Sequence, residues 1–418
     1  FKPQRDAQLR GEHVNFTEER AALHTALRGS PLRELRPDSQ DLMPAIEQTL
    51  ARMRELCRQI RDGRRAGSDK RRITDVVNVG IGGSQLGPLL ACQALREYAH
   101  DGPAIHFLGN VDPGAWDALR PRLNPRTTLV IIASKSWKTV ETIRNSEAVC
   151  QWLMDAGIKG SELSFHLVGI TARPDRARAT GLVDETIFPF WEWVGGRFSL
   201  WSAIGLPVML AIGPEAFDQL LQGARDMDEH FASAPLEKNA PLLLALTTVW
   251  NQLALPGSSE AIVPYCDALS RFPAYLQQLQ MESNGKSVDL NGSPVITSTI
   301  PVIWGEPGTD AQHAFFQALH QGTAMQSVEF IIVIPTKPDA QRRDYSLVAN
   351  AIAQAEALMR GRDLSESLEK LLDSGTNEIQ AKKTAPHLVL PGNRPSTTIV
   401  LGKLTPHSLG ALLALYEH

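Results

Sequence analysis

The sequence Val77-Asn78-Val79-Gly80-Ile81-Gly82-Gly83-Ser84 passes from a β-rich apolar run directly into a glycine turn. Residues from Leu86 onward follow a helical pattern, so a strand, a glycine loop and a helix start are predicted in succession. Glycine lets a backbone pass close to an anion, and a helix start offers unpaired N–H donors. The stretch predicts a phosphate site at a strand end, although this loop alone leaves open a tight turn without a ligand.

The same loop argues against two common nucleotide-binding motifs. Gln85 stands where the third glycine of G-x-G-x-x-G would be, and the loop lacks the lysine of a Walker loop. A nicotinamide-dependent dehydrogenase is therefore disfavoured.

Around this loop, short β-rich runs alternate with helical patterns between about Lys70 and Pro189, which predicts a parallel sheet with helical crossovers. After Ser199 the pattern turns mainly helical, and strands recur only at long intervals, which favours a second α/β unit. A helix with one apolar stripe is expected over residues 40–61. The expected strands are Asp75–Val79, Ala104–Leu108, Thr128–Ala133, Ser164–Ile170, Ala261–Pro264, Val328–Ile334 and Thr397–Leu401.

Composition excludes several classes of protein. The 418 residues carry a formal net charge of −4 at pH 7, which gives no basic field for nucleic acid. No apolar stretch approaches the roughly 20 residues that a membrane span needs. The four cysteines lie far apart without metal-ligand spacing, so we expect reduced, mostly buried thiols in a cytoplasmic protein.

A second polar loop follows the strand that ends at Ala133. It reads Ser134-Lys135-Ser136-Trp137-Lys138-Thr139, and a helix is expected to begin at Val140. Hydroxyls, ammonium groups and helix-start amides at the carboxyl end of a strand suit a phosphate. With the first loop, this favours a phosphorylated metabolite, whereas a helix cap with solvated lysines is the alternative.

Three charged residues of the second half are candidates for chemistry. Arg197 follows the glycine turn Gly195-Gly196 and could stabilise negative charge, or it could pair with Glu192. Glu282 lies at the end of a helical pattern before a glycine turn, where a carboxylate can act as base and then acid. His313 could transfer protons near neutrality. Most such glutamates and histidines are structural or solvated, and spacing alone does not connect these three residues.

Taken together, the motifs resemble the glucose-6-phosphate isomerase family over about residues 11–418. Gly11–Glu18 resembles an N-terminal segment of the family, and six further blocks follow in family order. These blocks are Gly80–Pro88, Ala133–Thr142, Val194–Leu206, Gln277–Lys286, Trp304–Gly322 and Lys403–His418.

The resemblance implies an α/β fold of two sugar-isomerase (SIS-type) domains, each with a mainly parallel sheet flanked by helices. The expected domains are residues 38–210, with the phosphate-binding loops, and residues 211–418 with 1–37, with the catalytic glutamate and histidine. It also implies a homodimer with shared active sites, and an enzyme of glycolysis and gluconeogenesis.

The resemblance further implies the reaction and its residues. Glucose 6-phosphate and fructose 6-phosphate are interconverted by ring opening, assisted by His313, and by proton transfer between C1 and C2 through a cis-enediol. Glu282 moves the proton, Arg197 stabilises the intermediate, and no metal or organic cofactor is required. The expected substrate-binding residues are Gly83, Ser84, Ser134, Lys135, Ser136, Thr139, Gly196 and Gln278.

The chain departs from the family pattern in three places. Trp137-Lys138 replace the usual Phe-Thr, and we expect Lys138 to face solvent. Asp310-Ala311 replace the usual Asn-Gly, which removes a flexible glycine ahead of His313. Family members also continue beyond His418 into a segment with an active-site lysine and glutamine, so we expect a fragment of a complete enzyme.

A sugar-phosphate-sensing module without catalysis is the rival hypothesis, because the same domain type can bind a phosphosugar and signal through a partner. The presence of Glu282, Arg197 and His313 beside the phosphate loops favours chemistry, since sensing needs no base.

Overall fold

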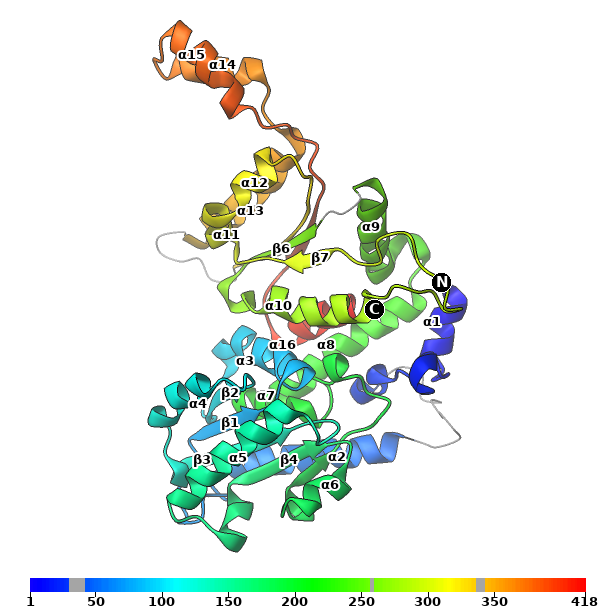
Figure 1. Ribbon diagram of the computed structural model, residues 1–418, viewed down its shortest axis with the longest axis vertical. Helices are drawn as coiled ribbons and strands as arrows, with labels where there is room; N and C mark the ends of the chain where they lie inside the picture. The colour runs from blue at the N-terminus through cyan, green and yellow to red at the C-terminus, as the bar shows by residue number, and fades with distance from the viewer. Residues whose placement is uncertain (30–41, 256–258, 336–342) are drawn as a thin grey trace. The chain divides into compact units, whose positions relative to one another are not determined.

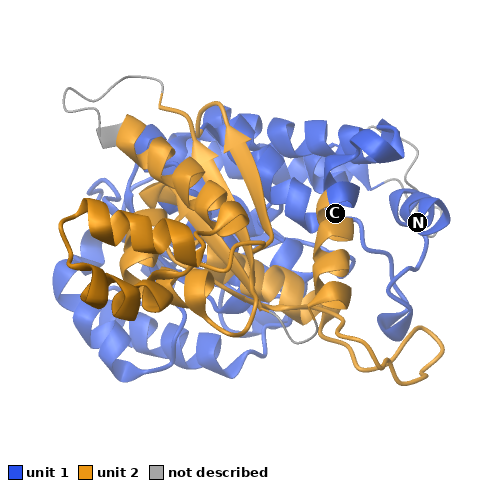
Figure 2. Cartoon of the chain, turned by 90° about the horizontal axis from the view of Figure 1, so that it is seen from above, with its two compact units in different colours: residues 1–243, 405–418 blue, residues 244–404 orange. Residues whose placement is uncertain are grey.

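The computed structural model describes residues 1–29, 42–255, 259–335 and 343–418 (Figure 1). Its described residues form two compact units, residues 1–243 with 405–418 and residues 244–404 (Figure 2). Each unit contains one wholly parallel sheet with helices against it, so the expected α/β fold class is confirmed.

The first unit contains a five-stranded sheet in the order β2-β1-β3-β4-β5. Its strands are β1 (Asp75–Val79), β2 (Ala104–Leu108), β3 (Thr128–Ala133), β4 (Leu167–Thr171) and β5 (Ile187–Pro189). Its helices are α1 (Lys2–Leu9), α2 (Met43–Arg61), α3 (Leu86–Ala94), α4 (Pro113–Leu119), α5 (Val140–Asp155), α6 (Pro174–Ala179), α7 (Leu206–Ile212), α8 (Pro214–Ser233) and α16 (Pro406–Glu417).

The strand register places the two polar loops next to each other. Within the sheet, β1 pairs in parallel with β3, and Val79 lies opposite Ile132. Because parallel strands end at the same edge of a sheet, the loops after β1 and β3 leave that edge as neighbours. Apolar side chains such as Val77, Val130 and Leu153 are fully buried in the core that supports this edge.

The second unit contains a four-stranded sheet in the order β7-β6-β8-β9. Its strands are β6 (Ser259–Tyr265), β7 (Val302–Trp304), β8 (Ser327–Val333) and β9 (Ser396–Leu401). Its helices are α10 (Phe272–Leu276), a π-helix (Gln277–Glu282), α11 (Gly308–Ala314), α12 (Phe316–Gln321), α13 (Arg343–Arg360), α14 (Leu364–Asp373) and α15 (Glu378–Thr384), while α9 (Ala240–Ala254) crosses from the first unit into the second.

The division into units differs from the expected domain boundaries. Helices α8 and α16 lie side by side in the first unit, far apart in the sequence (Figure 1). Glycines allow this close packing, because a Cβ at Gly223 would overlap the carbonyl of His407 and one at Gly410 would overlap the carbonyl of Leu220. The expected start of the first domain, residue 38, lies outside the described residues, and the domain assignment stays a prediction.

All seven expected strands are present, with shifts of up to three residues at their ends. The expected helix over residues 40–61 is α2, which is described from Met43. Two strands were missed, β5 and β7, because each has only three residues and lies at a sheet edge. Such short runs carry no alternation that a sequence pattern can detect.

The four cysteines are free thiols, but only Cys57 is fully buried, whereas the other three are partly exposed. Within the described part of the chain, no helix combines the length and apolar character that crossing a bilayer requires.

Two buried carboxyl groups share one face of the second sheet. Glu260 on β6 and Glu329 on β8 are each 3% exposed, and the pairing of Glu260 with Ser327 puts both carboxyl side chains on the same side. Burial, and then the nearby charge of Glu329, raise the pKa of Glu260 to about 8. The folded chain therefore holds a proton that the unfolded chain releases at lower pH.

We predict that Glu260→Gln stabilises the protein at alkaline pH. A raised pKa gives stability that is present below the ordinary value of 4.5 and is lost as the pH rises through about 8. The amide takes up no proton, so the variant should unfold at a higher temperature than the parent near pH 8 and should depend less steeply on pH. Thermal unfolding across this range measures the effect, with exposed Glu369→Gln as control. Parallel curves for the parent and Glu260→Gln would contradict the prediction.

Candidate functional site

The first loop brings backbone and hydroxyl groups to the carboxyl end of β1. Residues Gly82–Ser84 form one turn of 3₁₀-helix, in which Gly82 has a left-handed φ of 58°, and α3 begins two residues after Ser84. The buried side chain of Asn78 donates a hydrogen bond of 3.0 Å to the carbonyl of Ser84. The loop is therefore held from within the strand that precedes it.

The second loop presents hydroxyls at the start of α5. The hydroxyls of Ser134 and Thr139 lie 3.2 Å apart, and Ser134 Oγ accepts a hydrogen bond of 3.1 Å from the Trp137 amide. Thr139 is the N-cap residue of α5, yet its hydroxyl makes no capping hydrogen bond. The hydroxyl of Ser136 accepts from the Lys138 amide at 3.2 Å. Lys138 itself is exposed, as expected for a residue that faces solvent.

Lys135 connects the second loop to the segment that carries Arg197. Its Nζ donates hydrogen bonds of 2.7 Å to the carbonyl of Glu192 and 2.8 Å to that of Val194. Burial, together with the charge of Arg20, lowers the pKa of Lys135 despite the nearby carboxylate of Glu192. Lys135 is thus partly buried and hydrogen-bonded to backbone. The alternative of a helix cap without a ligand had required this lysine to be solvated.

The first loop meets the Arg197 turn by backbone contact. A Cβ added to Gly83 would overlap the carbonyl group of Gly196 and lie 2.6 Å from the Arg197 amide nitrogen. Residues Gly196–Phe198 form a 3₁₀ turn, and the Arg197 guanidinium lies 5.3 Å from the centroid of the Phe198 ring. Glu192, the alternative partner considered for Arg197, pairs with Arg20 at 3.0 Å and Lys135 at 3.6 Å.

These contacts gather eight of the predicted site residues around one edge of the first sheet. Sequence reasoning missed the residues that hold them, namely Asn78, Arg20 and Arg176, whose Nη1 donates to the carbonyl of Ser136 at 2.6 Å. Asn78 carried a usable signal, because it is a polar residue inside an apolar strand. The eight gathered residues are Gly83, Ser84, Ser134, Lys135, Ser136, Thr139, Gly196 and Arg197.

The remaining three predicted residues lie in the second unit. Gln278 and Glu282 are four residues apart on the π-helix, so their side chains lie near the same face. Glu282 is exposed, and its carbonyl accepts a hydrogen bond of 2.6 Å from Lys286 Nζ. His313 is exposed on α11, the helix that begins where Gly308 packs against the Tyr265 ring.

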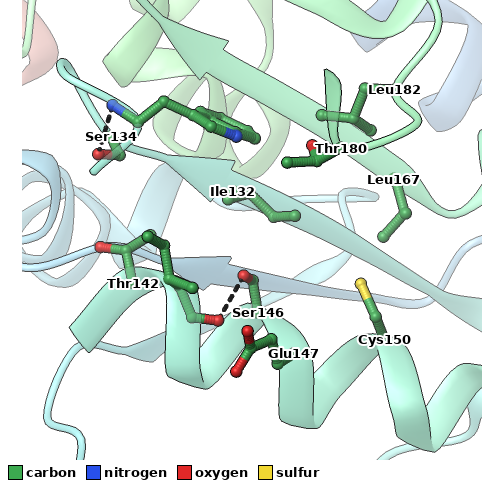
Figure 3. A pocket seen from close by; sticks show the side chains of 11 residues that line it. Ile132, Ser134, Thr142, Ser146, Glu147, Cys150, Leu167, Thr180 and Leu182 are labelled. Atoms are coloured by element: carbon green, nitrogen blue, oxygen red, sulfur yellow. Dashed lines mark hydrogen bonds between the residues drawn. The ribbon is translucent and has the colours of Figure 1, made fainter. Parts of the chain in front are cut away.

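A cavity of about 310 Å³ lies under the second loop, between the sheet and α5 (Figure 3). Its lining is mainly apolar and includes Ile132, Leu167, Leu182 and the Trp137 side chain. Ser134 is the one predicted site residue in that lining. Hydroxyls and cations that suit a sugar phosphate therefore lie mostly outside this cavity, which we do not assign to the substrate.

The described residues contain no group of three or more His, Cys, Asp or Glu side chains arranged to hold a metal ion. The first unit offers hydroxyl donors and two cations, which can bind an anion. The second unit offers an amide, a carboxylate and an imidazole, of which the last two can move protons.

Comparisons with known proteins agree over nearly the whole chain. The family model described as phosphoglucose isomerase matches residues 1–418. The glucose-6-phosphate isomerase of Xanthobacter autotrophicus is 49% identical over 416 residues, which cover 99% of this chain and 76% of that protein. That of Brucella ovis is 48% identical over 417 residues, with 99% and 75% covered.

Two solved structures are similar to this chain over most of its length. The crystal structure of a glucose-6-phosphate isomerase from Chlamydia trachomatis matches with a TM-score of 0.83 and 32% identity, covering 100% of this chain and 77% of that one. A hypothetical protein from Thermus thermophilus matches with a TM-score of 0.63 and 27% identity, covering 94% of this chain and 85% of the other.

We predict that Gly83→Ala weakens sugar-phosphate binding by about tenfold or more, because a displacement costing about 1.4 kcal/mol already has that effect. The added methyl group collides with backbone at Gly196, which cannot rotate away as a side chain could. Calorimetric titration with a sugar phosphate measures the affinity. Gly402→Ala is the control, since a Cβ there meets nothing within 4 Å. Equal affinities for the parent and Gly83→Ala would contradict the predicted contact.

Proposed function

This chain belongs to the phosphoglucose isomerase family, and we infer from that membership that it is an aldose–ketose isomerase interconverting glucose 6-phosphate and fructose 6-phosphate. The observation that carries this conclusion is 49% identity to a glucose-6-phosphate isomerase over 99% of the chain. The meeting of the two polar loops with the Arg197 turn supports a sugar-phosphate substrate independently of that identity.

The phosphate group is bound by the loops of the first unit. The hydroxyls of Ser84, Ser134, Ser136 and Thr139 supply donors, and the first turn of α5 adds backbone N–H groups and the positive end of the helix dipole. Lys135 has three N–H donors, of which two reach backbone carbonyls. Its Nζ also lies 3.6 Å from the Glu192 carboxylate, so Lys135 acts on the phosphate through its charge, and the backbone of Gly83 and Gly196 completes the site.

The proton is moved by Glu282 after His313 has assisted ring opening and Gln278 has bound the sugar. In the open-chain aldose, the Glu282 carboxylate takes the proton from C2, while the C1 carbonyl oxygen takes up a proton from the solvent and becomes a hydroxyl of the cis-enediol. Glu282 then returns its proton to C1, while the C2 hydroxyl gives its proton back to the solvent and becomes the ketose carbonyl. One carboxylate serves as base and then as acid, and Glu282 is exposed at the last residue of the π-helix, where a substrate can reach it.

Negative charge on the sugar oxygens is stabilised by Arg197. Charge develops on these oxygens as C2 is deprotonated, and a cation fixed beforehand stabilises it without reorganising during the reaction. The 3₁₀ turn, the Gly83 contact and the Phe198 ring all restrict Arg197, which supports this role. None of these steps requires a metal ion or an organic cofactor.

The chain also acts as a cytoplasmic homodimer with shared active sites. Four free thiols suit a reducing compartment. The proposal of a dimer rests on the family resemblance, because the resemblance implies an active site between subunits. The interconversion of glucose 6-phosphate and fructose 6-phosphate is a step of glycolysis and gluconeogenesis.

We predict that Glu282→Gln lowers turnover by about 10²–10⁴-fold, the usual contribution of a positioned proton-transfer group. The amide keeps the size of the side chain but cannot accept the proton, so the Michaelis constant should change little. Steady-state conversion of fructose 6-phosphate, coupled to oxidation of glucose 6-phosphate, measures both constants. Exposed Glu369→Gln on α14 is the matched control. Parent-like turnover in Glu282→Gln would remove this residue from the mechanism.

We predict that the molar mass of the active protein, measured by sedimentation velocity, is twice that of one chain. If the sites are shared, activity per chain should fall on dilution as dimers separate, because an isolated subunit lacks part of each site. Sedimentation velocity and activity measured on the same dilution series test this. A monomer that keeps full specific activity would contradict the shared-site proposal.

A further inference from the structure

A segment near the start of the chain contacts the loop that carries Arg197 through hydrogen bonds and a stacked pair of rings. We call residues 20–28 the clamp segment and residues 190–198 the aromatic loop; both lie in the first unit. Arg20 Nη1 donates a hydrogen bond of 2.6 Å to the carbonyl of Glu192 and lies 3.0 Å from the Glu192 carboxylate. The amide of Leu23 donates to the carbonyl of Trp193 at 3.3 Å. The clamp segment thus binds the backbone of the aromatic loop at successive residues.

The clamp segment also contacts the side chain next to Arg197. The ring of His24 stacks on that of Phe198, with centroids 4.7 Å apart and planes inclined by 28°. The same Phe198 ring has the Arg197 guanidinium 5.3 Å from its centroid. Phe198 is therefore in contact with both side chains, so the position of its ring depends on His24 and in turn restricts Arg197.

The far end of the clamp segment is fixed by a buried charge cluster. Residues His24–Arg28 form a single 3₁₀ segment, and Arg28 is fully buried. Arg28 Nε donates a hydrogen bond of 2.6 Å to Asp228, and its other nitrogens bind Asp228 and Glu417. Glu417 also accepts from Trp201 Nε1 at 2.8 Å. Breaking the buried Arg28–Asp228 pair would leave a buried charge unmatched, so the cluster holds one geometry.

His24 acts at this place as a neutral aromatic surface. Burial, and then the charges of Arg28 and His418, lower the pKa of His24 well below its ordinary value, against the opposing pull of Asp228. An uncharged ring stacks on Phe198 without repelling the guanidinium of Arg197 or that of Arg28. The useful property of His24 here is its flat shape, which a phenyl ring can reproduce.

We propose that His24 is a positioning residue for Arg197: anchored by the Arg28 cluster, it supports the Phe198 ring and so holds the guanidinium where charge develops on the substrate. This inference rests on the proposed role of Arg197. Nothing in the reaction itself assigns a role to the clamp segment, whose residues neither carry the proton nor bind the phosphate. Its effect should fall on the chemical step, because phosphate is bound by other groups.

The test compares His24→Ala and His24→Phe in the full chain. His24→Ala removes the stacked ring, and we expect turnover to fall by about tenfold to 10²-fold with a Michaelis constant within a factor of about three, since small misplacements near a site have effects of this size. His24→Phe restores the stack without a ring nitrogen and should recover most of the turnover. Hydrogen exchange of peptides covering residues 191–198 should rise in His24→Ala and return to the parent level in His24→Phe.

Controls separate positioning from general destabilisation. Leu153→Ala creates a cavity in a core cluster of the same unit that includes no residue of the aromatic loop, so it should lower the unfolding temperature while hydrogen exchange over residues 191–198 stays at the parent level. Unchanged exchange over residues 191–198 in His24→Ala would overturn the proposal, and so would a His24→Phe variant as impaired as His24→Ala. Failure of the proposed function has a different signature: Arg197→Lys would keep parent turnover while His24→Ala still raised exchange.

Discussion

The contact between Gly83 and Gly196 is the constraint on which the rest of the site depends. Two stretches of backbone meet there at a distance that excludes even a methyl group, which joins the loop after β1 to the turn that carries Arg197. Lys135 makes the corresponding link from the loop after β3, by donating to the carbonyls of Glu192 and Val194. An anion-binding edge and a cation for charge stabilisation are thereby held in one rigid arrangement. The parallel pairing of β1 with β3 makes this possible, because both loops must leave the sheet side by side.

Charge is buried in the two units in opposite ways. In the first unit, Arg28 is matched by Asp228 and Glu417, and the attraction of these carboxylates outweighs the burial that would lower its pKa, so the pKa of Arg28 is raised. In the second unit, Glu260 faces a like charge on Glu329 and keeps its proton. The first arrangement fixes the position of a segment that contacts the functional loop. The second makes stability depend on pH. The buried Arg28 cluster thus fixes a segment of the first unit, and the buried Glu260 makes the stability of the second unit depend on pH.

Sequence patterns predicted most strands of both sheets well, because each strand is marked by its own local run of apolar residues. The runs at Asp75–Val79, Ala104–Leu108 and Thr128–Ala133 are strands with the expected ends, since apolar β-rich segments bounded by turn residues leave little choice. The three-residue strands β5 and β7 were missed because their pairing comes from neighbouring strands. The π-helix at Gln277–Glu282 was expected only as the end of a helical pattern, since no local propensity distinguishes an inserted residue.

The site was predicted less completely, for a physical reason. Glycines and hydroxyls next to strands indicate an anion site from the local sequence. The contacts of Arg20 and His24 with the aromatic loop, however, join residues more than 170 positions apart, and such contacts produce no repeating pattern in the sequence. We propose that these loops hold the phosphate while Glu282 reaches C1 and C2 of the same sugar. A crystal structure with fructose 6-phosphate bound tests it most directly. We expect the phosphate to lie among Ser134, Ser136 and Thr139, with the Glu282 carboxylate about 3 Å from C1 or C2. A phosphate bound elsewhere, or a Glu282 remote from the sugar in every subunit, would contradict it.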